Sequence, residues 1–495
     1  MGFVGRTVRP GGNTQPADRA VRYRPDMTET VTAVVLGAGA ATRFGGGKLL
    51  APVAGTPILQ HVLDALASAG LEDVVVVLGR DAADVEAAIT WRGERRVVNP
   101  DPERGLASSL QIGFAAVGRS AGAILVALGD QPLVAPEVIR SLLDAPARRG
   151  RPVVVPVYSD ERGHNPVLLR RPAFHLVADA EGDRGLGPVL AAHPELVTEI
   201  PVPGTNPDVD TPADLARAIE ASWGVRVRAN GDQVERFREV ADDADFYAPV
   251  RSLFRADPTR RDDPVLAVLL RLVRSGDRWL DVGAGAGRFA LPIARALDPS
   301  GGEVVALDAS PAMLEALREI AEDHAIENIR TTEARWPPAP DSAAAAVTAD
   351  VVLIAHVGYD VEAIGAFVDA MESAADRLCV AVMMDRVPAS AADAFWPLVH
   401  GEARAALPAL PDFVELLRSR GRRPSVERVL VEPRRFDTRA SLEGFVRRQL
   451  WIDPAGPSEA RLQSALEEIA IQDGEGWTIK GRGPSDIGVV TWEPV

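Results

Sequence analysis

Two glycine-rich turns, each following a run of β-forming residues, carry the clearest chemical potential in this 495-residue chain. The first, VVLGAGAATRFGGGKLL (Val34 to Leu50), combines glycines with Arg43 and Lys48. The second, WLDVGAGAGRFA (Trp279 to Ala290), places Asp281 before its glycines and contains no lysine. Glycines let a backbone approach a ligand closely, while arginine and lysine neutralise phosphate. The two turns therefore predict two different ligands.

The first turn fits neither of two common phosphate loops. A Walker A loop has Ser or Thr after its lysine to bind Mg²⁺, whereas Leu49 follows Lys48 here. A dinucleotide-binding turn has a third glycine that packs helix against strand, and Thr42 stands at that position. The remaining interpretation is a long loop whose backbone N–H groups wrap a triphosphate, with Arg43 and Lys48 neutralising it.

Three aspartates could add a divalent metal to this site. Asp130 ends the strand-like run AILVALGD, and ligands of open α/β sheets bind at the carboxyl ends of strands. Asp208 and Asp210, in PDVDTP, are a second source of carboxylates. Because Mg²⁺ uses few carboxylates together with phosphate oxygens and water, we expect these three aspartates to be metal ligands. A capping or turn role stays open for Asp130 and for Asp210.

The first turn and five later motifs resemble the MobA-like nucleotidyltransferases, and within them the molybdenum cofactor cytidylyltransferases. The loop of that family is close to L-A-A-G-x-S-x-R-x-G-x-x-K-L-L, and this chain has LGAGAATRFGGGKLL. The later motifs follow in the expected order: GLASSL (Gly105 to Leu110), ALGDQPLV (Ala127 to Val134), RGHNPVLL (Arg162 to Leu169), GDRGLGPVL (Gly182 to Leu190) and NPDVDTPADL (Asn206 to Leu215).

The resemblance implies transfer of a nucleoside monophosphate from an NTP, with CTP favoured, to the phosphate of molybdopterin or its molybdenum form. Pyrophosphate is the leaving product and Mg²⁺ the metal. The implied catalytic residues are Lys48, Arg43 and Asp130. The implied nucleotide-binding residues are Leu36, Gly37, Ala38, Gly39, Arg43, Lys48, Ser108 and Ser109, and those contacting the acceptor are His164, Asn165, Asp183 and Arg184.

Three positions depart from the family pattern. Gly37 replaces the usual Ala, Ala41 replaces the usual Ser, and Asn165 is inserted between the His and Pro of the common G-H-P-V. Ala41 and Asn165 lie in the parts expected to contact the nucleotide and the acceptor. The choice among CTP, GTP and ATP therefore stays open.

The second turn resembles motif I of class I S-adenosylmethionine-dependent methyltransferases. Asp281 could bind the methionyl ammonium, and Asp308, at the end of GEVVALD, could accept both ribose hydroxyls. The G-x-G-x-G spacing counts against the main rival, an NAD site. The S-adenosylmethionine-binding residues that we expect are Asp281, Gly283, Gly285, Gly287, Asp308, Ala309, Glu333, Ala334 and His356.

Two alternatives remain, and no motif identifies the methyl acceptor. The second half could be a module that binds S-adenosylmethionine, or nothing, and delivers the cofactor to a molybdenum-enzyme apoprotein. The first half could be a sugar- or alcohol-phosphate nucleotidyltransferase. His356, Tyr359 and Asp360 follow a strand-like run and are candidates either for acceptor contact or for packing.

The elements that must position these residues alternate between strands and helices. In the first half, TAVVLGA, DVVVVLG, AILVALGD and RPVVVPV alternate with helical runs such as TPILQHVLDALASAG. A second series contains RWLDVGA, GEVVALD, ADVVLIAHV and RLCVAVMM. We predict an α/β protein with two doubly wound Rossmann-like domains, residues 31–223 and 261–495, joined by a linker and lead-in at 224–260. A helical insertion from Pro388 to about Gly474 is expected to cap the second site.

Composition narrows the classes of function and location. A net charge of −16 argues against a general nucleic-acid binder. The single cysteine, Cys379, excludes an intramolecular disulfide, and no apolar run is long enough to span a bilayer. We expect a cytoplasmic enzyme without nucleic-acid or membrane partners. Residues 1–30 are expected to be a flexible basic tail rather than a secretory signal, with a translation start at Met27 as the alternative hypothesis.

Overall fold

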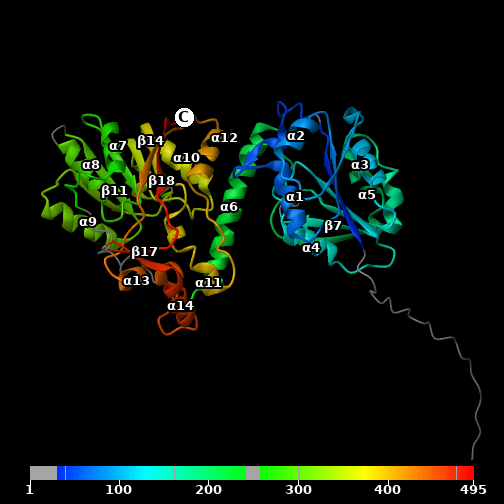
Figure 1. Cartoon of the computed structure of the whole chain (residues 1–495). Coiled ribbons are helices and arrows are strands. Elements are labelled where there is room, and N and C mark those ends of the chain that lie inside the picture. The colour runs from blue at the N-terminus through cyan, green and yellow to red at the C-terminus, as the bar shows by residue number, and fades with distance from the viewer. Residues whose placement is uncertain are drawn as a thin grey trace, which may run out of the picture.

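The computed structural model describes residues 30–39, 41–159, 163–240, 257–298, 301–339, 341–474 and 476–495. The expectations for the N-terminal tail and for Met27 lie outside these residues, as do residues 241–256 of the expected linker. Figure 1 shows two α/β domains with one long helix, α6 (Pro212–Phe237), lying between them. None of the helices in the described ranges is long and apolar enough to cross a membrane.

The first domain is built on a seven-stranded sheet in which only one strand is antiparallel to its neighbours, so the expected α/β architecture is confirmed. The strand order is β5-β4-β1-β6-β8-β7-β9, and the antiparallel strand is β8. The strands are β1 (Val31–Gly37), β4 (Val74–Leu78), β5 (Arg95–Val98), β6 (Ala123–Leu128), β7 (Val153–Tyr158), β8 (Val167–Arg170) and β9 (Val197–Val202).

Helices cover both faces of this sheet because its central strands are apolar on both sides. One core is formed with α1 and α4, and the other with α3 and its neighbours. The helices are α1 (Ile58–Ser68), α2 (Ala82–Ala88), α3 (Leu106–Ala115), α4 (Pro136–Leu143) and α5 (Gly187–Ala192). Two short strands, β2 (Pro52–Val53) and β3 (Thr56–Pro57), form a hairpin just after the glycine-rich loop.

The second domain repeats this plan with strand order β12-β11-β10-β13-β14-β18-β15, in which only β18 is antiparallel. The strands are β10 (Arg278–Val282), β11 (Glu303–Asp308), β12 (Ile329–Glu333), β13 (Ala349–Ala355), β14 (Ala375–Met384), β15 (Ser425–Val431) and β18 (Ser485–Trp492). The covering helices are α7 (Pro264–Leu272), α8 (Ala290–Leu297), α9 (Pro311–Asp323), α10 (Ile364–Ala374) and α12 (Leu410–Ser419).

The helical insertion is smaller than expected. Its own apolar core joins α11 (Trp396–His400), α13 (Arg439–Gln449) and α14 (Glu459–Ile469) with the hairpin of β16 (Ala470–Asp473) and β17 (Gly476–Ile479). Within the range 388–474, α12 and β15 instead belong to the main domain, because β15 pairs with β18 and α12 packs on the sheet core. This group of α11, α13, α14, β16 and β17 is called the cap below.

Helix α6 runs through the expected boundary at residues 223 and 224, so the first 14 residues of the expected linker, 224–237, are helical. The Thr211 side chain and Asp214 form a capping box that starts the helix. Buried positions recur every three or four residues, at Ile219, Trp223, Val227, Asn230 and beyond, along one side of α6. The helical spacing of buried residues thus continues past residue 224, where the sequence becomes more charged.

Both domains pack against α6. Trp223 donates from Nε1 to the carbonyl oxygen of Val361 at 2.9 Å, and its ring meets that of Phe413 edge-on at 6.3 Å. On the side of the first domain, Val53 and Ile58 belong to the same buried cluster as Trp223. The two domains therefore share one apolar core around this helix.

Replacing Trp223 by alanine should destabilise the protein by about 3 to 5 kcal/mol, the usual cost of removing a buried aromatic side chain. Trp223 is 2% exposed, whereas Val225 on the same helix is 48% exposed. Urea unfolding followed by circular dichroism measures the effect. The matched control Val225→Ala should change stability by less than about 0.5 kcal/mol. Equal losses in the two variants would contradict the shared core.

Candidate active sites

A cavity of about 480 Å³ lies at the carboxyl ends of β1 and β6 in the first domain. The glycine-rich loop after β1 forms one wall, and the aspartates expected to bind metal form another. The expected nucleotide and metal residues that line it are Leu36, Gly37, Ala38, Gly39, Arg43, Lys48, Ser109, Asp130, Asp208 and Asp210. Residues from five of the six motifs quoted from the sequence, all except RGHNPVLL, thus line this one cavity.

Lys48 lies at the centre of this cavity wall. Its Nζ is 2.5 Å from Oδ2 of Asp130 and 3.2 Å from Oδ1 of Asp210, and its side chain is only 9% exposed. Burial alone would lower the pKa of Lys48, but the two carboxylates outweigh burial and raise it. Lys48 is therefore a fixed positive charge at neutral pH. Arg43 adds a second, exposed cation, 3.4 Å from Asp210 Oδ2.

The aspartates near Lys48 differ in how well they could bind a divalent metal. Oδ1 of Asp130 is buried without a hydrogen-bond partner in the structure, so it is available to a cation. Asp208 is less suited, because its Oδ1 accepts a hydrogen bond from Gln131 Nε2 at 2.7 Å. Burial raises the pKa of Asp208, and the charge of Asp130 raises it further.

The three aspartates do not form a complete metal cage. Among the residues that the structure describes, no group of three or more His, Cys, Asp and Glu side chains could hold a metal ion. Asp130 and Asp210 match the coordination that Mg²⁺ prefers, with one or two carboxylates and the remaining positions filled by phosphate oxygens and water. The expectation of three aspartate ligands thus reduces to these two.

The serines of GLASSL have different positions. Asn99 Nδ2 donates to the hydroxyl oxygens of Ser108 and Ser109, each at 2.9 Å. Ser109 lines the nucleotide cavity, whereas Ser108 does not line it and donates back to the carbonyl oxygen of Gly105 at 2.8 Å. Ser108 therefore fixes the start of α3, and the sequence motif could not separate this role from ligand contact.

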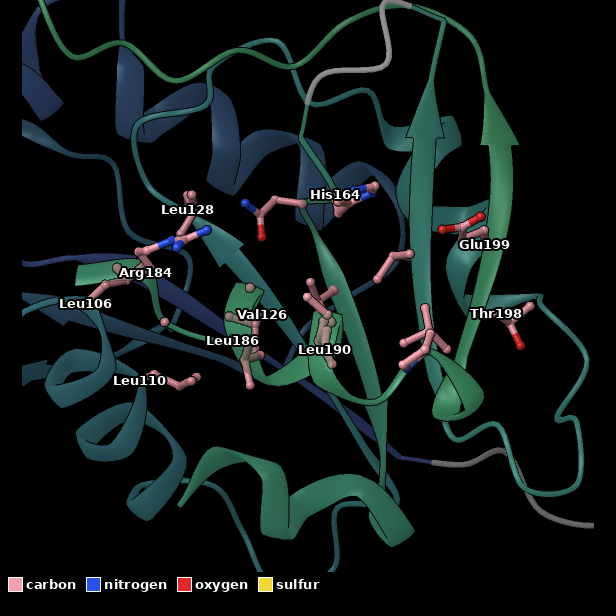
Figure 2. Close-up of a pocket in the computed structure, with 18 of the residues that line it drawn as sticks. Leu106, Leu110, Val126, Leu128, His164, Arg184, Leu186, Leu190, Thr198 and Glu199 are labelled. Carbon is pink, nitrogen blue, oxygen red and sulfur yellow. The ribbon is translucent and has the colours of Figure 1, made fainter. Parts of the chain in front are cut away.

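A second cavity, of about 630 Å³, adjoins the first and shares Leu36, Leu106 and Leu128 with it. Figure 2 shows Arg184 beside Leu106 and Leu128 on one side of this cavity and Thr198 and Glu199 on the other. Of the residues expected to contact the acceptor, His164, Asn165 and Arg184 line it. Asp183 lines the nucleotide cavity instead.

Local hydrogen bonds hold the His164 segment in place. His164 Nδ1 lies 3.3 Å from the carbonyl oxygen of Pro156, and Tyr158 Oη donates to the carbonyl oxygen of Asn165 at 2.8 Å. Asn206 Nδ2 reaches the same carbonyl at 3.4 Å. The inserted Asn165 therefore connects the strand pair β7 and β8 with the segment that carries Asp208.

Sequence reasoning missed a buried amide pair that links the segments carrying Asp130 and Asp208. Gln131 Nε2 donates to the carbonyl oxygen of Asn206 at 3.2 Å, and Asn206 Nδ2 donates to Gln131 Oε1 at 3.1 Å. The pair joins the loop after Asp130 to the loop before Asp208. Both residues stand inside motifs quoted from the sequence, but only the fold brings the two motifs together.

In the second domain, a cavity of about 780 Å³ lies over the glycine turn. The turn is tight, because Gly283 N–H donates to the carbonyl oxygen of Leu307 at 2.7 Å and Gly285 N–H donates to Asp308 Oδ2 at 2.8 Å. Gly283 and Gly285 both have positive φ angles, 71° and 54°, which glycine adopts without strain. The expected residues that line this cavity are Asp281, Gly283, Gly285, Asp308, Ala309 and His356.

Asp281 is the most perturbed acid of this cavity. It is 3% exposed, and its Oδ1 is buried without a hydrogen-bond partner in the structure. Burial, with a smaller contribution from the charge of Asp308, raises the pKa of Asp281 to about 7. A buried carboxyl group with one oxygen free of hydrogen bonds fits the ammonium group of S-adenosylmethionine, which would restore the ionised form.

Three expected residues do not line the cavity. A side chain at Gly287 would meet Leu291 at 2.8 Å and Leu317 at 3.0 Å, so this glycine serves helix packing. Glu333 is exposed on β12, opposite Asp308 in the strand register, and Ala334 packs against a buried core. Glu333 and Ala334 lie near Asp308 because β12 pairs with β11, and neither of them lines the cavity.

His356 lines the cavity with a strained backbone, at φ 58°. Its Nδ1 is buried without a partner, and burial, aided by the charge of Arg288, lowers the pKa of His356 to about 4. Asp263, which holds Arg288 at 3.0 Å, also lines this wall, and neither residue was expected from the sequence. Of the other candidates, Tyr359 is buried in the core and Asp360 is exposed.

Comparison with known protein families assigns both domains. Residues 33–197 match the family described as MobA-like NTP transferase domain, and residues 273–391 match the family described as methyltransferase domain.

Individual relatives cover parts of the chain. The bifunctional protein GlmU of Allorhizobium ampelinum is 39% identical over 113 residues, which are 22% of this chain and 25% of that protein. The chain thus spans about a quarter of this curated relative. The crystal structure of Rv0371c from Mycobacterium tuberculosis is 36% identical and covers 39% of this chain and 100% of its own, with a TM-score of 0.36. YcgJ from Bacillus subtilis is 14% identical and covers 46% and 98%, with a TM-score of 0.33.

The raised pKa of Asp281 predicts a pH-dependent stability for the ligand-free protein. Between the ordinary value of 3.8 and about 7, the folded protein retains a proton that the unfolded chain has released, so stability falls as pH rises through this window. Between about pH 5 and about pH 8, titration of Asp281 should lower the free energy of unfolding by about 2 to 3 kcal/mol.

Urea unfolding of the wild type and of Asp281→Asn at both pH values measures this difference. The variant should lose this part of the pH dependence, whereas Asp298→Asn, at an exposed carboxyl, should keep it. Parallel pH curves for wild type and Asp281→Asn would refute the assignment.

Proposed function

Because residues 33–197 belong to the MobA-like NTP transferase family and residues 273–391 to the methyltransferase family, we propose an enzyme with two active sites. In the first, a nucleoside monophosphate passes from an NTP, CTP by preference, to the phosphate of molybdopterin or its molybdenum form. In the second, a methyl group passes from S-adenosylmethionine to an acceptor.

The observation that carries the first activity is the convergence of Asp130 and Asp210 on Lys48 beside the glycine loop. In nucleotidyl transfer, an oxygen of the acceptor phosphate bonds to the α-phosphorus while the bond to the β-phosphate oxygen breaks, and pyrophosphate leaves. Lys48 and Arg43 can neutralise the charge that accumulates on the triphosphate. A bound Mg²⁺ held by Asp130 and Asp210 would supply further charge neutralisation.

The character of the adjoining cavity supports a heterocyclic acceptor. Its floor is aliphatic, with side chains such as Leu110, Val126 and Leu186, and Arg184 stands where it adjoins the nucleotide cavity. These aliphatic side chains can pack against the flat face of a ring such as a pterin. The polar side chains His164, Asn165, Thr198 and Glu199, which also line the cavity, can bind the polar edge of that ring.

The observation that supports the second activity is the pairing of a positive-φ glycine turn with two acids, Asp281 and Asp308. Asp308 accepts hydrogen bonds from the backbone N–H groups of Gly285 and Ser310, each at 2.8 Å, so its carboxylate is held in a fixed position at the end of β11. S-adenosylmethionine supplies an activated methyl group, and the protein then needs chiefly to bind and orient the reactants.

The decisive measurement for the first site is pyrophosphate release with CTP, GTP or ATP, with and without molybdopterin. Release that depends on molybdopterin, and is fastest with CTP, is expected. Equal release with a panel of sugar phosphates would favour the alternative nucleotidyltransferase function, and no molybdopterin-dependent release with any NTP would refute the proposal.

Replacing Asp130 by alanine should reduce nucleotidyl transfer by roughly a hundredfold or more, because a preorganised charged group in the reaction site is lost. Circular dichroism should show that the fold is kept. Asp144→Ala, which removes an exposed carboxylate in the same domain, is the control and should retain normal turnover. Near-normal turnover of the Asp130 variant would exclude its role.

Replacing Asp308 by alanine should weaken S-adenosylmethionine binding by roughly 1.5 to 3 kcal/mol, the scale of hydrogen bonds to a charged group. Isothermal titration calorimetry on the full chain measures the dissociation constant, with Asp298→Ala as the control. An unchanged constant for the Asp308 variant would remove the ribose assignment. A wild type that binds S-adenosylmethionine but methylates no component of a cell extract would favour the delivery module instead.

A further inference from the structure

The second cavity of the first domain, of about 630 Å³, lies across four neighbouring strands of the sheet. Its lining includes residues of β6, β8, β7 and β9, which follow one another in that order. Strands in a sheet are about 4.8 Å apart, so three spacings place β9 about 14 Å from β6. The carboxyl end of β6 leads to Asp130 in the nucleotide cavity. The second cavity therefore has one end beside the nucleotide and a distant end at β9.

One residue from each of these strands contributes to a row across the cavity. Val126 on β6 pairs with Val167 on β8, and Val155 on β7 pairs with Glu199 on β9. The antiparallel register of β7 and β8 joins the two pairs, because it brings Val155 level with Val167. All four residues line the cavity, and the three valines are at most 4% exposed. The row is thus a strip of three valines that ends in a carboxylate.

Glu199 is this carboxylate, at the distant end of the row. Because side chains alternate along a strand, Glu199 shares one face of β9 with Val197, which also lines the cavity. In Figure 2 the side chain of Glu199 extends from β9 toward the side on which Val126 and His164 lie. In the described parts of the chain, Glu199 takes part in no salt bridge or side-chain hydrogen bond. Both of its oxygens can therefore accept hydrogen bonds from a ligand.

Two exposed arginines, Arg148 and Arg151, line the same end of the cavity. Neither forms a salt bridge with Glu199, and Arg151 Nη1 instead donates to the carbonyl oxygen of Val197 at 3.1 Å. Both arginines precede β7, so they stand outside the row that runs from Val126 to Glu199. A ligand edge that carries acceptors would favour these arginines, whereas an edge that carries donors would favour Glu199.

The pyrimidinone edge of a pterin is an edge of the second kind. A ring N–H and the adjacent amino group are two donors side by side, and a carboxylate can accept both with its two oxygens, as it does from the fork of an arginine. The flat faces of the rings can pack on the buried valines. In molybdopterin the phosphate lies at the other end of the fused rings from this edge, so the two ends of the molecule match the two ends of the cavity.

We propose that Glu199 binds the amino-pyrimidinone edge of a pterin acceptor and thereby directs the acceptor phosphate toward the nucleotide. The inference rests on the proposed nucleotidyl transfer, and it adds the residue that selects a pterin and sets its direction in the cavity. Glu199 is a positioning residue, because it lies at the end of the cavity away from the reacting phosphates. Its contact is the same before and during transfer, so loss of the contact should raise the KM for molybdopterin and leave kcat unchanged.

Fluorescence titration of the full chain with pterin and with lumazine tests this assignment. The two compounds differ at one position, where pterin has an amino group and lumazine has an oxygen. The wild type should bind pterin roughly tenfold or more tightly than lumazine, because lumazine lacks one hydrogen bond to a charged acceptor. Glu199→Gln should abolish this preference. The same variant should raise the KM for molybdopterin roughly tenfold in the pyrophosphate assay, with kcat and the KM for CTP unchanged.

Glu195→Gln is the matched control, because Glu195 is also an exposed carboxylate of this segment but does not line the cavity. It should keep the preference for pterin. Equal affinities of the two probes, binding of neither, or an undiminished preference in Glu199→Gln would overturn the inference. A preference for lumazine would also overturn it and would assign this end to Arg148 and Arg151. The proposed function stands in each case while pyrophosphate release by the wild type depends on molybdopterin, and it fails if that dependence is absent.

Discussion

Burial of helix α6 between the two domains is the constraint on which the rest of the structure depends. The helix begins two residues after Asp210, a carboxylate that lines the first cavity, and its Trp223 lies in the apolar core that the two domains share. A hairpin that follows the Lys48 loop reaches the same interface, where Gly55 N–H donates to Glu415 Oε2 at 2.9 Å. The segments carrying Lys48 and Asp210 are thus both supported by the second domain.

This arrangement makes the site of the first domain more rigid than a glycine-rich loop would be alone. Two motif segments, 82 and 162 residues further along the chain, meet at the ammonium group of Lys48. Salt bridges between mobile, exposed side chains contribute little, whereas this one is enclosed and is backed by the buried pair of Gln131 and Asn206. Rigid placement of opposite charges is what phosphoryl chemistry requires of a protein.

The two glycine turns share the conformational freedom of glycine but differ in the charges around them. In the first domain, cations of the loop face carboxylates contributed by distant segments. In the second, the turn itself is held by Asp308 and borders Asp281, whose carboxyl group is buried with its Oδ1 free of hydrogen bonds. Each ligand region is therefore distinguished by the charges around it rather than by the shape of its glycine turn.

The sequence by itself determined the two α/β domains, the main parallel strands and most residues of the two glycine turns, because hydrophobic periodicity and glycine spacing are local properties of the chain. It did not distinguish Ser108 from Ser109, Gly287 from Gly285, or Asp183 from Arg184. The members of each pair are close in sequence, and only packing decides which cavity, if any, each of them lines.

Tertiary structure also decided the role of α6. The charged second half of this helix suggested a linker from the sequence, but in the structure both domains pack against the helix. It joined Gln131 to Asn206 and brought Asp130 and Asp210 to Lys48. These are contacts between segments far apart in the chain, or on separate elements, and no local pattern encodes them. Their energies come from burial and from charges brought together, which exist only once the chain has folded.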